Sequence, residues 1–294
     1  MTRIGFIGLG SMGLPMAKNL VRRGFELRGF DARPSAMEAL AEAGGVPAET
    51  APAASHNADF LVLMVVDAVQ AEAVLFGAGA LDALPRESTV VLMATCPPGA
   101  VAALAERVEA TGRRFVDAPV SGGVVGAAAA TLSIMAAAPR QTFEAARPLF
   151  EALGSNIFHV GERAGQGATV KAVNQLLCGV HLAVAGEALS LAKKVGIDTS
   201  VVLEILSGSS AASWMLRDRG PRMQAAAPEI TSAVDIFVKD LGIVLAAGRE
   251  AKAALPLAAV AHQMFLSVSG RGLGALDDSQ VIRAFDALNG NEGE

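Results

Sequence analysis

Three glycines at the end of the first apolar run limit the fold more than any other feature of the sequence. The run RIGFIG, residues 3–8, leads into GLGSMG, which places Gly8, Gly10 and Gly13 in the spacing G-x-G-x-x-G. The segment LPMAKNLVRR that follows has the composition of a helix and is closed by Gly24. A glycine turn between a strand and a helix is typical of the dinucleotide-binding turn of a parallel α/β sheet. The sequence therefore predicts a Rossmann-type domain from the first residues of the chain onward.

Each glycine of this turn has an expected task. The first allows the tight turn, the second lets the backbone approach a pyrophosphate, and the third allows the helix to pack closely on the strand. The phosphates would then lie over the helix N-terminus. Because a chain with 31 glycines can produce this spacing by chance, a purely structural turn is the alternative. The expected cofactor-binding residues of the turn are Gly8, Leu9, Gly10, Ser11, Met12 and Gly13.

Asp31, at the end of the second apolar run, indicates which dinucleotide is bound. It lies 18 residues after Gly13, close to the spacing of about 20 expected for the acid that binds the adenosine ribose hydroxyls. A carboxylate there would repel a 2′-phosphate, which favours NAD. Arg33 lies two residues further on and could accept that phosphate, so NADP stays open. A solvated acid at a strand end is the other interpretation of Asp31.

Apolar runs alternate with helical segments up to about residue 160, as in a parallel sheet with crossover helices. Expected strands are residues 3–8, 26–31, 60–66, 89–95, 113–120 and 131–138, and expected helices include 36–44 and 98–110. After residue 167 the pattern changes, because residues 168–195 lack proline, are rich in alanine and leucine, and end before Gly196. Later helical segments are 199–207, 234–250, 256–268 and 278–287.

This pattern predicts two domains. Residues 1–163 are expected to form an NAD(P)-binding Rossmann domain with a doubly wound sheet. Residues 164–294 are expected to form an all-α domain for substrate binding and oligomerisation. The two would be joined by a connecting helix roughly 40 Å long.

Composition and charge exclude several classes of partner. The chain has a net charge of −5 and no cluster of Lys and Arg, so we expect no nucleic-acid partner. The apolar run 124–138 is shorter than the roughly 20 residues that cross a bilayer, and the N-terminus lacks a signal-peptide pattern, so we expect no membrane partner. Cys96 and Cys178 match no metal-binding or disulfide pattern and suit a reducing cytoplasm.

Lys171 interrupts the apolar start of the long helix. Asn174 and Gln175 follow at i+3 and i+4, so all three side chains project from one helix face. Desolvation favours the neutral amine of a buried lysine, which can accept an alcohol proton and return it in the reverse direction. A lysine that reaches solvent from the helix surface is the alternative.

Four stretches, in chain order, resemble the β-hydroxyacid dehydrogenase family, which includes 3-hydroxyisobutyrate dehydrogenase and tartronate semialdehyde reductase. They are GFIGLGSMGLPMAKNL from Gly5, FVDAPVSGG from Phe115, GQGATVKAVNQ from Gly165 and VKDLG from Val238. The resemblance implies a Rossmann domain, a long connecting helix and a helical C-terminal domain. It also implies NAD-dependent oxidation of a small hydroxy acid, or the reverse reduction, by a homodimer or homotetramer.

The resemblance further implies roles for individual residues. Lys171 would be the catalytic acid and base, and Asn174 would orient the substrate. Relatives commonly have a second asparagine where this chain has Gln175, so the role of Gln175 is open. Ser121, Gly122 and Gly123 offer a hydroxyl and backbone N–H groups that suit a carboxylate. The expected substrate-binding residues are Ser121, Gly122, Gly123, Asn174, Gln175 and Lys239, and the further cofactor-binding residues are Met64, Val65, Thr95 and Lys239.

Several activities are compatible with these residues. The helix from Lys171 is most similar to that of L-threonate dehydrogenases, and 3-hydroxyisobutyrate and tartronate semialdehyde (2-hydroxy-3-oxopropionate) are the alternative substrates. Imine reductases share the fold but typically lack the lysine. An alternative of another class is a dinucleotide sensor without turnover, since fold alone does not determine function. The lysine, the asparagine and the anion-binding glycines favour the enzyme.

Overall fold

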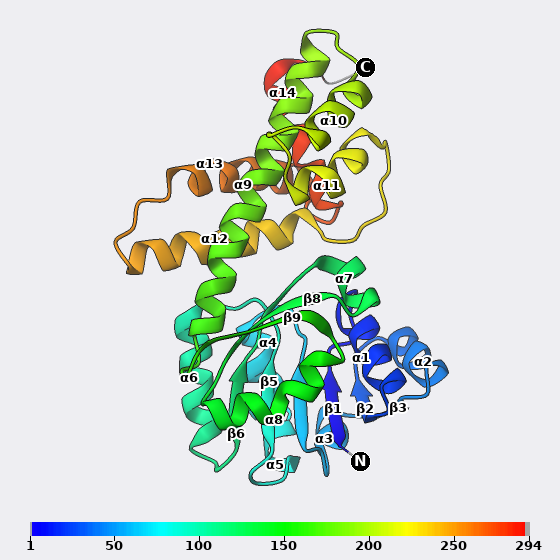
Figure 1. The fold of residues 1–294 in the computed structure, drawn as a ribbon, viewed down its shortest axis with the longest axis vertical. Coiled ribbons are helices and arrows are strands. Elements are labelled where there is room, and N and C mark those ends of the chain that lie inside the picture. The colour runs from blue at the N-terminus through cyan, green and yellow to red at the C-terminus, as the bar shows by residue number, and fades with distance from the viewer. Residues whose placement is uncertain (1, 292–294) are drawn as a thin grey trace. The chain divides into compact units, whose positions relative to one another are not determined.

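The computed structural model describes residues 2–291. The chain forms two compact units, Met1–Lys171 and Ala172–Glu294. The first is an α/β unit and the second is helical (Figure 1). The fold class predicted from the sequence is therefore confirmed.

The first unit is built on one mixed sheet with the strand order β3-β2-β1-β4-β5-β6-β8-β7, and β9 pairs with β8. The pairs from β3 to β6 are all parallel, and Ile4 of β1 lies between Leu27 of β2 and Phe60 of β4. The strands β1 to β3 are added on one side of β1, and β4 to β6 on the other. The order of strands therefore reverses at the boundary between β1 and β4, as in dinucleotide-binding folds. The strands are β1 (Arg3–Ile7), β2 (Glu26–Phe30), β3 (Val46–Pro47), β4 (Phe60–Leu63), β5 (Thr89–Leu92), β6 (Arg114–Asp117), β7 (Val120–Ser121), β8 (Leu132–Ala137) and β9 (Gly154–Gly161).

Helices cover both faces of this sheet. On β4, Val62 faces one apolar cluster while Leu61 and Leu63 face the other, so the strand is buried on both sides and reads as a continuous apolar run. One cluster includes α1 (Gly13–Arg22), α2 (Pro34–Glu42), α7 (Gly123–Ala129) and α8 (Arg140–Glu151). The other includes α3 (Ala51–Ser55), α4 (Ala68–Glu72), η1 (Ala73–Gly77), α5 (Ala80–Ala83) and α6 (Pro98–Glu109).

The second unit is helical within the described residues, apart from one isolated β-bridge between Ala233 and Asp277. Its core includes Leu182 and Leu189, and the rings of Phe237 and Phe265 stack with centroids 5.0 Å apart. The elements are α9 (Gln166–Lys194), which begins in the first unit, α10 (Thr199–Gly208), α11 (Trp214–Gln224), α12 (Val234–Glu250), α13 (Pro256–Val268), η2 (Ser269–Leu273), η3 (Asp278–Val281) and α14 (Ile282–Asn289).

Helix α9 is long and apolar enough to cross a membrane by length and composition alone. Half of its most apolar window is buried inside the protein, and Leu182 and Leu189 belong to the core of the second unit. It is therefore a core helix of the second unit.

The sheet differs from the sequence prediction at one end. The expected strand 113–120 is two strands, β6 and β7, separated by Ala118 and Pro119. Both strands run in the same direction along β8 and pair with it antiparallel. The link from β7 to β8, residues 122–131, is shorter than the dozen or more residues that a parallel crossover needs. The strands β3 and β9 were not predicted, because β3 has two residues and much of β9 is exposed or half-buried.

Candidate active site

The GLGSMG turn links β1 to α1 and depends on glycine for steric reasons. Gly8 has a φ of 94°, and a Cβ there would lie 2.4 Å from the carbonyl oxygen of Met64. A Cβ on Gly13 would lie 1.9 Å from the carbonyl oxygen of Gly8. At Gly10, in contrast, the nearest atom to a Cβ is Arg33 Nη2, at 4.0 Å. The first and third glycines are thus required by packing, and the second leaves an open approach to the backbone.

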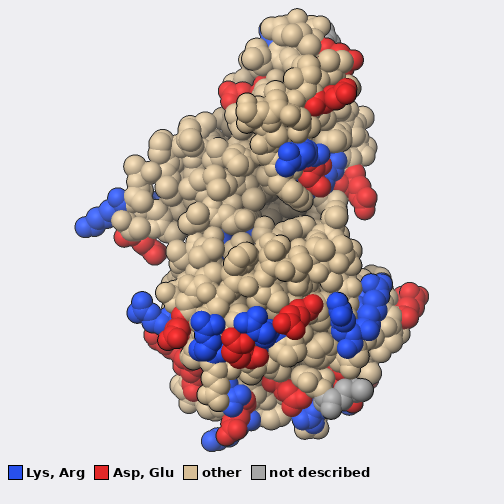
Figure 2. Space-filling model, in the orientation of Figure 1, with Lys and Arg blue, Asp and Glu red and all other residues tan. Residues whose placement is uncertain are grey.

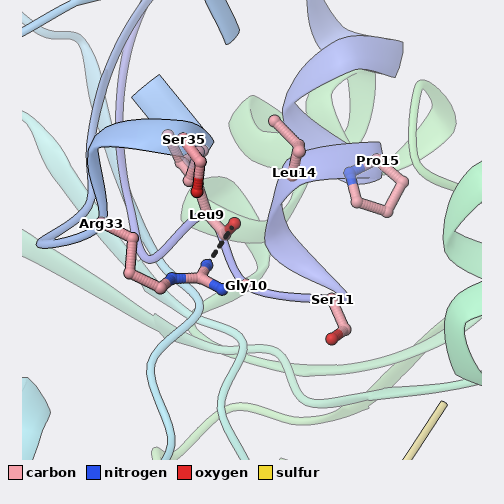
Figure 3. Close-up of a pocket in the computed structure, with 8 residues that line it drawn as sticks. Leu9, Gly10, Ser11, Leu14, Pro15, Arg33 and Ser35 are labelled. Carbon is pink, nitrogen blue, oxygen red and sulfur yellow. Dashed lines mark hydrogen bonds between the residues drawn. The ribbon is translucent and has the colours of Figure 1, made fainter. Parts of the chain in front are cut away.

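A cavity of about 250 Å³ lies over this turn (Figure 3). Helix α1 begins at its edge without a side-chain cap. The N–H of Leu14 donates to the carbonyl of Gly10 at 3.0 Å and Pro15 has no N–H, so the amides of the preceding turn are the ones that suit an anion. The open backbone at Gly10 and the uncapped helix fit the diphosphate of a dinucleotide. The cavity is lined by Leu9, Gly10, Ser11, Leu14, Pro15, Arg33, Ser35 and Ala36.

Asp31 and Arg33 are bound to the turn and to each other. Asp31 Oδ2 accepts the N–H of Leu9 at 2.7 Å, and Asp31 Oδ1 accepts Arg33 Nε at 3.0 Å. Arg33 Nη2 also donates to the carbonyl of Leu9 at 2.9 Å (Figure 3). Burial alone would raise the pKa of Asp31, but the hydrogen bonds from Arg33 and Leu9 outweigh burial and hold this pKa below its ordinary value. Asp31 is therefore an anion at neutral pH.

Further predicted residues follow the carboxyl ends of the neighbouring strands. Met64 and Val65 come directly after β4, and the N–H of Met64 donates to the carbonyl of Ile7 at 2.9 Å. Thr95 lies three residues beyond the end of β5. In a parallel sheet these ends share one edge with the glycine turn. The structure thus gathers the expected cofactor-binding residues of the first unit at this edge.

Ser121 ends β7, and two glycines with positive φ begin the next helix. The φ angles are 131° at Gly122 and 61° at Gly123, and α7 has no side-chain cap. The far end of α7 is tied to α1, since Asn19 Nδ2 donates to the carbonyl of Ala127 at 2.7 Å. The consecutive backbone amides at Gly122 and Gly123 suit an anion.

Lys171 lies in the first full turns of α9 and is only 6% exposed. The start of this helix is held by Asp117, the last residue of β6. Its Oδ2 accepts the N–H groups of Gly165 and Ala168, both at 2.9 Å. Burial raises the pKa of Asp117 to about 6, although the hydrogen bonds from the backbone at the start of α9 lower it in part.

In the second unit, a chain of polar contacts joins three of the predicted residues. Asn174 Nδ2 donates to Gln175 Oε1 at 2.9 Å, and Gln175 Nε2 donates to Asp240 Oδ2 at 2.5 Å. Asp240 Oδ1 lies 2.7 Å from Lys239 Nζ and accepts no hydrogen bond among the described residues, so this contact is one of charge. Asp240, only 2% exposed, thus connects Gln175 to Lys239.

Comparisons with known proteins show which family the chain belongs to. The chain matches the model of the NAD binding domain of 6-phosphogluconate dehydrogenase over residues 3–161. It matches the model of the NAD-binding region of NADP-dependent 3-hydroxyisobutyrate dehydrogenase over residues 165–285. The L-threonate dehydrogenase of Cupriavidus necator is 41% identical over 286 residues, which are 97% of this chain and 96% of that protein.

The chain belongs to the β-hydroxyacid dehydrogenase family.

Two other relatives support the same placement. The 2-hydroxy-3-oxopropionate reductase of Escherichia coli is 37% identical to this dehydrogenase, over 97% of this chain and 98% of that protein. A crystal structure of 3-hydroxyisobutyrate dehydrogenase from Salmonella typhimurium superposes with a TM-score of 0.93 at 36% identity, over 97% of this chain and 100% of that chain. The predicted family is thus confirmed, and the protein is an NAD(P)-dependent oxidoreductase that acts on hydroxy acids.

Sequence reasoning missed two acids of this dehydrogenase, Asp117 and Asp240. Both stand inside motifs that were recognised, FVDAPVSGG and VKDLG, and both are at most 2% exposed. An acid within an apolar strand or helix is rarely buried without partners. That rule could have marked both residues, although it does not identify their partners.

The raised pKa of Asp117 predicts a specific dependence of stability on pH. Its pKa is about 6 in the folded dehydrogenase against an ordinary 3.8, so the folded state holds a proton that the unfolded chain releases. This contribution to stability is complete below pH 3.8 and is lost as the pH rises through about 6.

Urea unfolding of wild type and Asp117→Asn from pH 4 to pH 7 measures this contribution. We expect the wild-type minus mutant free energy of unfolding to fall by about 2 kcal/mol over that range. The difference isolates Asp117, because every other titrating group is common to both proteins. A difference that stays constant with pH would contradict the prediction.

Proposed function

We propose that this dehydrogenase interconverts L-threonate and the corresponding oxo acid, with NAD+ as the preferred oxidant. The observation that carries the proposal is the buried Lys171 on α9, followed by Asn174 and by a Gln175 that is held by Asp240. The 41% identity to an L-threonate dehydrogenase supports threonate over other hydroxy acids.

In the proposed reaction Lys171 carries the proton. Its amine accepts the proton of the substrate hydroxyl during oxidation, and the ammonium returns it during reduction. A 6% exposed position supports this role, because desolvation favours the neutral amine. The nicotinamide ring, when bound, accepts the hydride.

The other predicted residues bind and orient. We assign the substrate carboxylate to Ser121 and the amides of Gly122 and Gly123, which suit an anion. Asn174 can orient the substrate through its amide oxygen, because its Nδ2 already donates to Gln175 Oε1 and to Cys178 Sγ. We assign to Gln175 the task of holding Asp240, which in turn holds Lys239 by charge.

We assign dinucleotide binding and the contacts to the substrate carboxylate to residues 1–163, and the other substrate-binding residues and oligomerisation to residues 164–294. The diphosphate would contact the turn from Gly8 to Gly13, and the adenosine ribose would contact Asp31. Met64, Val65 and Thr95 would line the cofactor, and Lys239 would approach the nicotinamide.

A substrate panel tests the proposed activity. Purified protein is incubated with NAD+ and, separately, with L-threonate, D-threonate or 3-hydroxyisobutyrate, and NADH absorbance is followed. Tartronate semialdehyde is tested in reverse with NADH. We expect the highest kcat/KM with L-threonate. A higher kcat/KM with 3-hydroxyisobutyrate or tartronate semialdehyde would assign that substrate in its place, and NADH binding without turnover on any acid would favour a sensor.

The contacts of Asp31 predict a preference for NAD over NADP. The anionic carboxylate would repel a 2′-phosphate, and Arg33 is occupied by Asp31 and the carbonyl of Leu9. We expect Asp31→Ser to lower the ratio of kcat/KM for NAD+ to that for NADP+ by about 10-fold or more, because the repulsion of the 2′-phosphate is lost. A 10-fold change corresponds to about 1.4 kcal/mol. In the matched variant Arg33→Ala, the ratio should not fall. An unchanged ratio in Asp31→Ser would remove Asp31 from cofactor choice.

We further propose a cytoplasmic homodimer or homotetramer. Val173, Leu177, Val184 and Leu191 are each at least 51% exposed on α9. The last three repeat every seven residues, as in a helix-to-helix seam. Figure 2 shows broad areas of the helical unit without charged residues. The small number of cysteines, two, suits a reducing compartment.

Light scattering coupled to size exclusion tests the oligomer. The wild type should elute with the mass of two or four chains, and Leu177→Glu with Leu191→Glu should elute as a monomer. Both glutamates would be exposed in the single chain, but in the oligomer they would place charges without partners in the buried seam. A monomeric wild type would contradict this proposal.

A further inference from the structure

The first turn of α9 is capped by a residue from a distant strand. The first N–H groups of a helix have no partner within the helix and need an acceptor from elsewhere. Here the acceptor is Asp117, whose Oδ2 lies 2.9 Å from the amides of both Gly165 and Ala168. A carboxylate at this end also complements the helix dipole. Asp117 therefore ties the beginning of α9 to the end of β6.

The same turn of α9 touches the sheet through backbone atoms. A Cβ on Gly167 would lie 2.5 Å from the carbonyl oxygen of Met135 in β8 and 2.7 Å from that of Asp117 in β6. Gly167 therefore lets the helix approach the two strands more closely than any other residue could. With Asp117 holding the amides, both the distance and the rotation of this turn are determined.

Lys171 stands at i+4 from Gly167 and thus on the same face of α9. One helical turn separates them, so any tilt or rotation of the first turn moves the lysine amine directly. All of these residues, from Asp117 to Lys171, belong to the first unit. The position of the amine is consequently set by the contact between α9 and the ends of β6 and β8.

We propose that Asp117 is a positioning residue for the proposed catalytic Lys171: its carboxylate fixes the first turn of α9 and thereby the place of the amine. This role rests on the proposed function.

The test compares Asp117→Ala and Asp117→Asn with a control variant, Ser88→Ala. Ser88 is 7% exposed, lies in the same unit and donates to the carbonyl of Ala58 at 2.8 Å, so its loss also removes a buried hydrogen bond. Each protein is measured for kcat and KM with L-threonate, for NADH affinity by fluorescence titration, and for Tm. Hydrogen exchange of the amides at Gly165 and Ala168 reports on the helix start without any turnover.

We expect Asp117→Ala to lower kcat by about 100-fold, the cost of a displacement of about 1 Å at a reacting group. NADH affinity should stay within about twofold, and the amides of Gly165 and Ala168 should exchange faster. Asp117→Asn keeps an oxygen acceptor, so its kcat should be about 10-fold higher than that of Asp117→Ala. Ser88→Ala should lower Tm without changing kcat.

Two results would overturn the proposal. One is a folded Asp117→Ala or Asp117→Asn with faster exchange at the helix start and wild-type kcat. The other is a Ser88→Ala protein whose kcat falls as far as that of Asp117→Ala at a similar loss of Tm. The effect of Asp117 on kcat would then be explained by general destabilisation. If Asp117→Ala does not fold, Asp117→Asn decides alone. A wild-type protein without turnover on any acid of the panel is a separate result, because it removes the proposed function itself.

Discussion

Replacing Lys171 with alanine is expected to lower kcat by about 100-fold or more, because the general acid and base is lost. NADH affinity should stay near wild type, since the glycine turn and Asp31 are unchanged. Lys171→Arg should be equally impaired, because a guanidinium keeps its proton at neutral pH. Steady-state kinetics with L-threonate and a fluorescence titration with NADH measure the two quantities separately.

Two controls sharpen this test. Lys194→Ala removes a lysine from the exposed last turn of the same helix and should leave kcat unchanged. Added primary amines should restore part of the activity of Lys171→Ala, because a small amine can enter the space of the lost side chain. A Lys171→Ala protein with near wild-type kcat would remove this residue from the mechanism.

The glycine turn was predictable because its causes are local. Gly8 needs a positive φ, and Gly13 packs against the carbonyl of Gly8 five residues earlier. Both requirements lie within one short stretch, so the spacing alone carries the information. The same holds for the position of Lys171, Asn174 and Gln175 along one helix, since helical periodicity places residues at i, i+3 and i+4 on one face.

Asp117 and Asp240 could not be paired from the sequence because their partners are distant. Asp117 binds the amide of Gly165 across 48 residues, and Asp240 binds Gln175 across 65 residues. No periodicity connects positions so far apart, and backbone N–H groups leave no trace in the sequence. The division of 113–120 into β6 and β7 was missed because both strands run in the same direction along β8, so no change of chain direction separates them.

The helical unit contains a second feature that the sequence does not reveal, a cluster of buried charges between α11 and η3. Arg219, 7% exposed, donates to both oxygens of Asp278 at 2.8 and 3.1 Å. Arg222 lies 3.1 Å from Asp277, and Asp218 contacts both arginines. Burial raises the pKa of Asp278, and Arg219 opposes that shift. Asp278 therefore depends on Arg219 for its ionised form.

Arg219→Met is expected to destabilise the helical unit by about 3–5 kcal/mol, because a buried carboxylate is left without its main partner. This corresponds to a Tm lower by roughly 10 °C. Urea and thermal unfolding measure the loss. Its size should grow from pH 5 to pH 8, because Asp278 without Arg219 must take up a proton or stay charged in an apolar place.

Two further variants separate this mechanism from a simple loss of packing. Arg219→Met with Asp278→Leu removes both charges and should recover part of the lost stability, since an apolar pair of similar volume can replace a buried ion pair. Arg3→Met breaks the exposed pair with Asp59, whose side chains are 49% and 40% exposed, and should leave Tm near wild type. If the double variant were less stable than Arg219→Met alone, the cost would arise from lost packing and not from the uncompensated charge of Asp278.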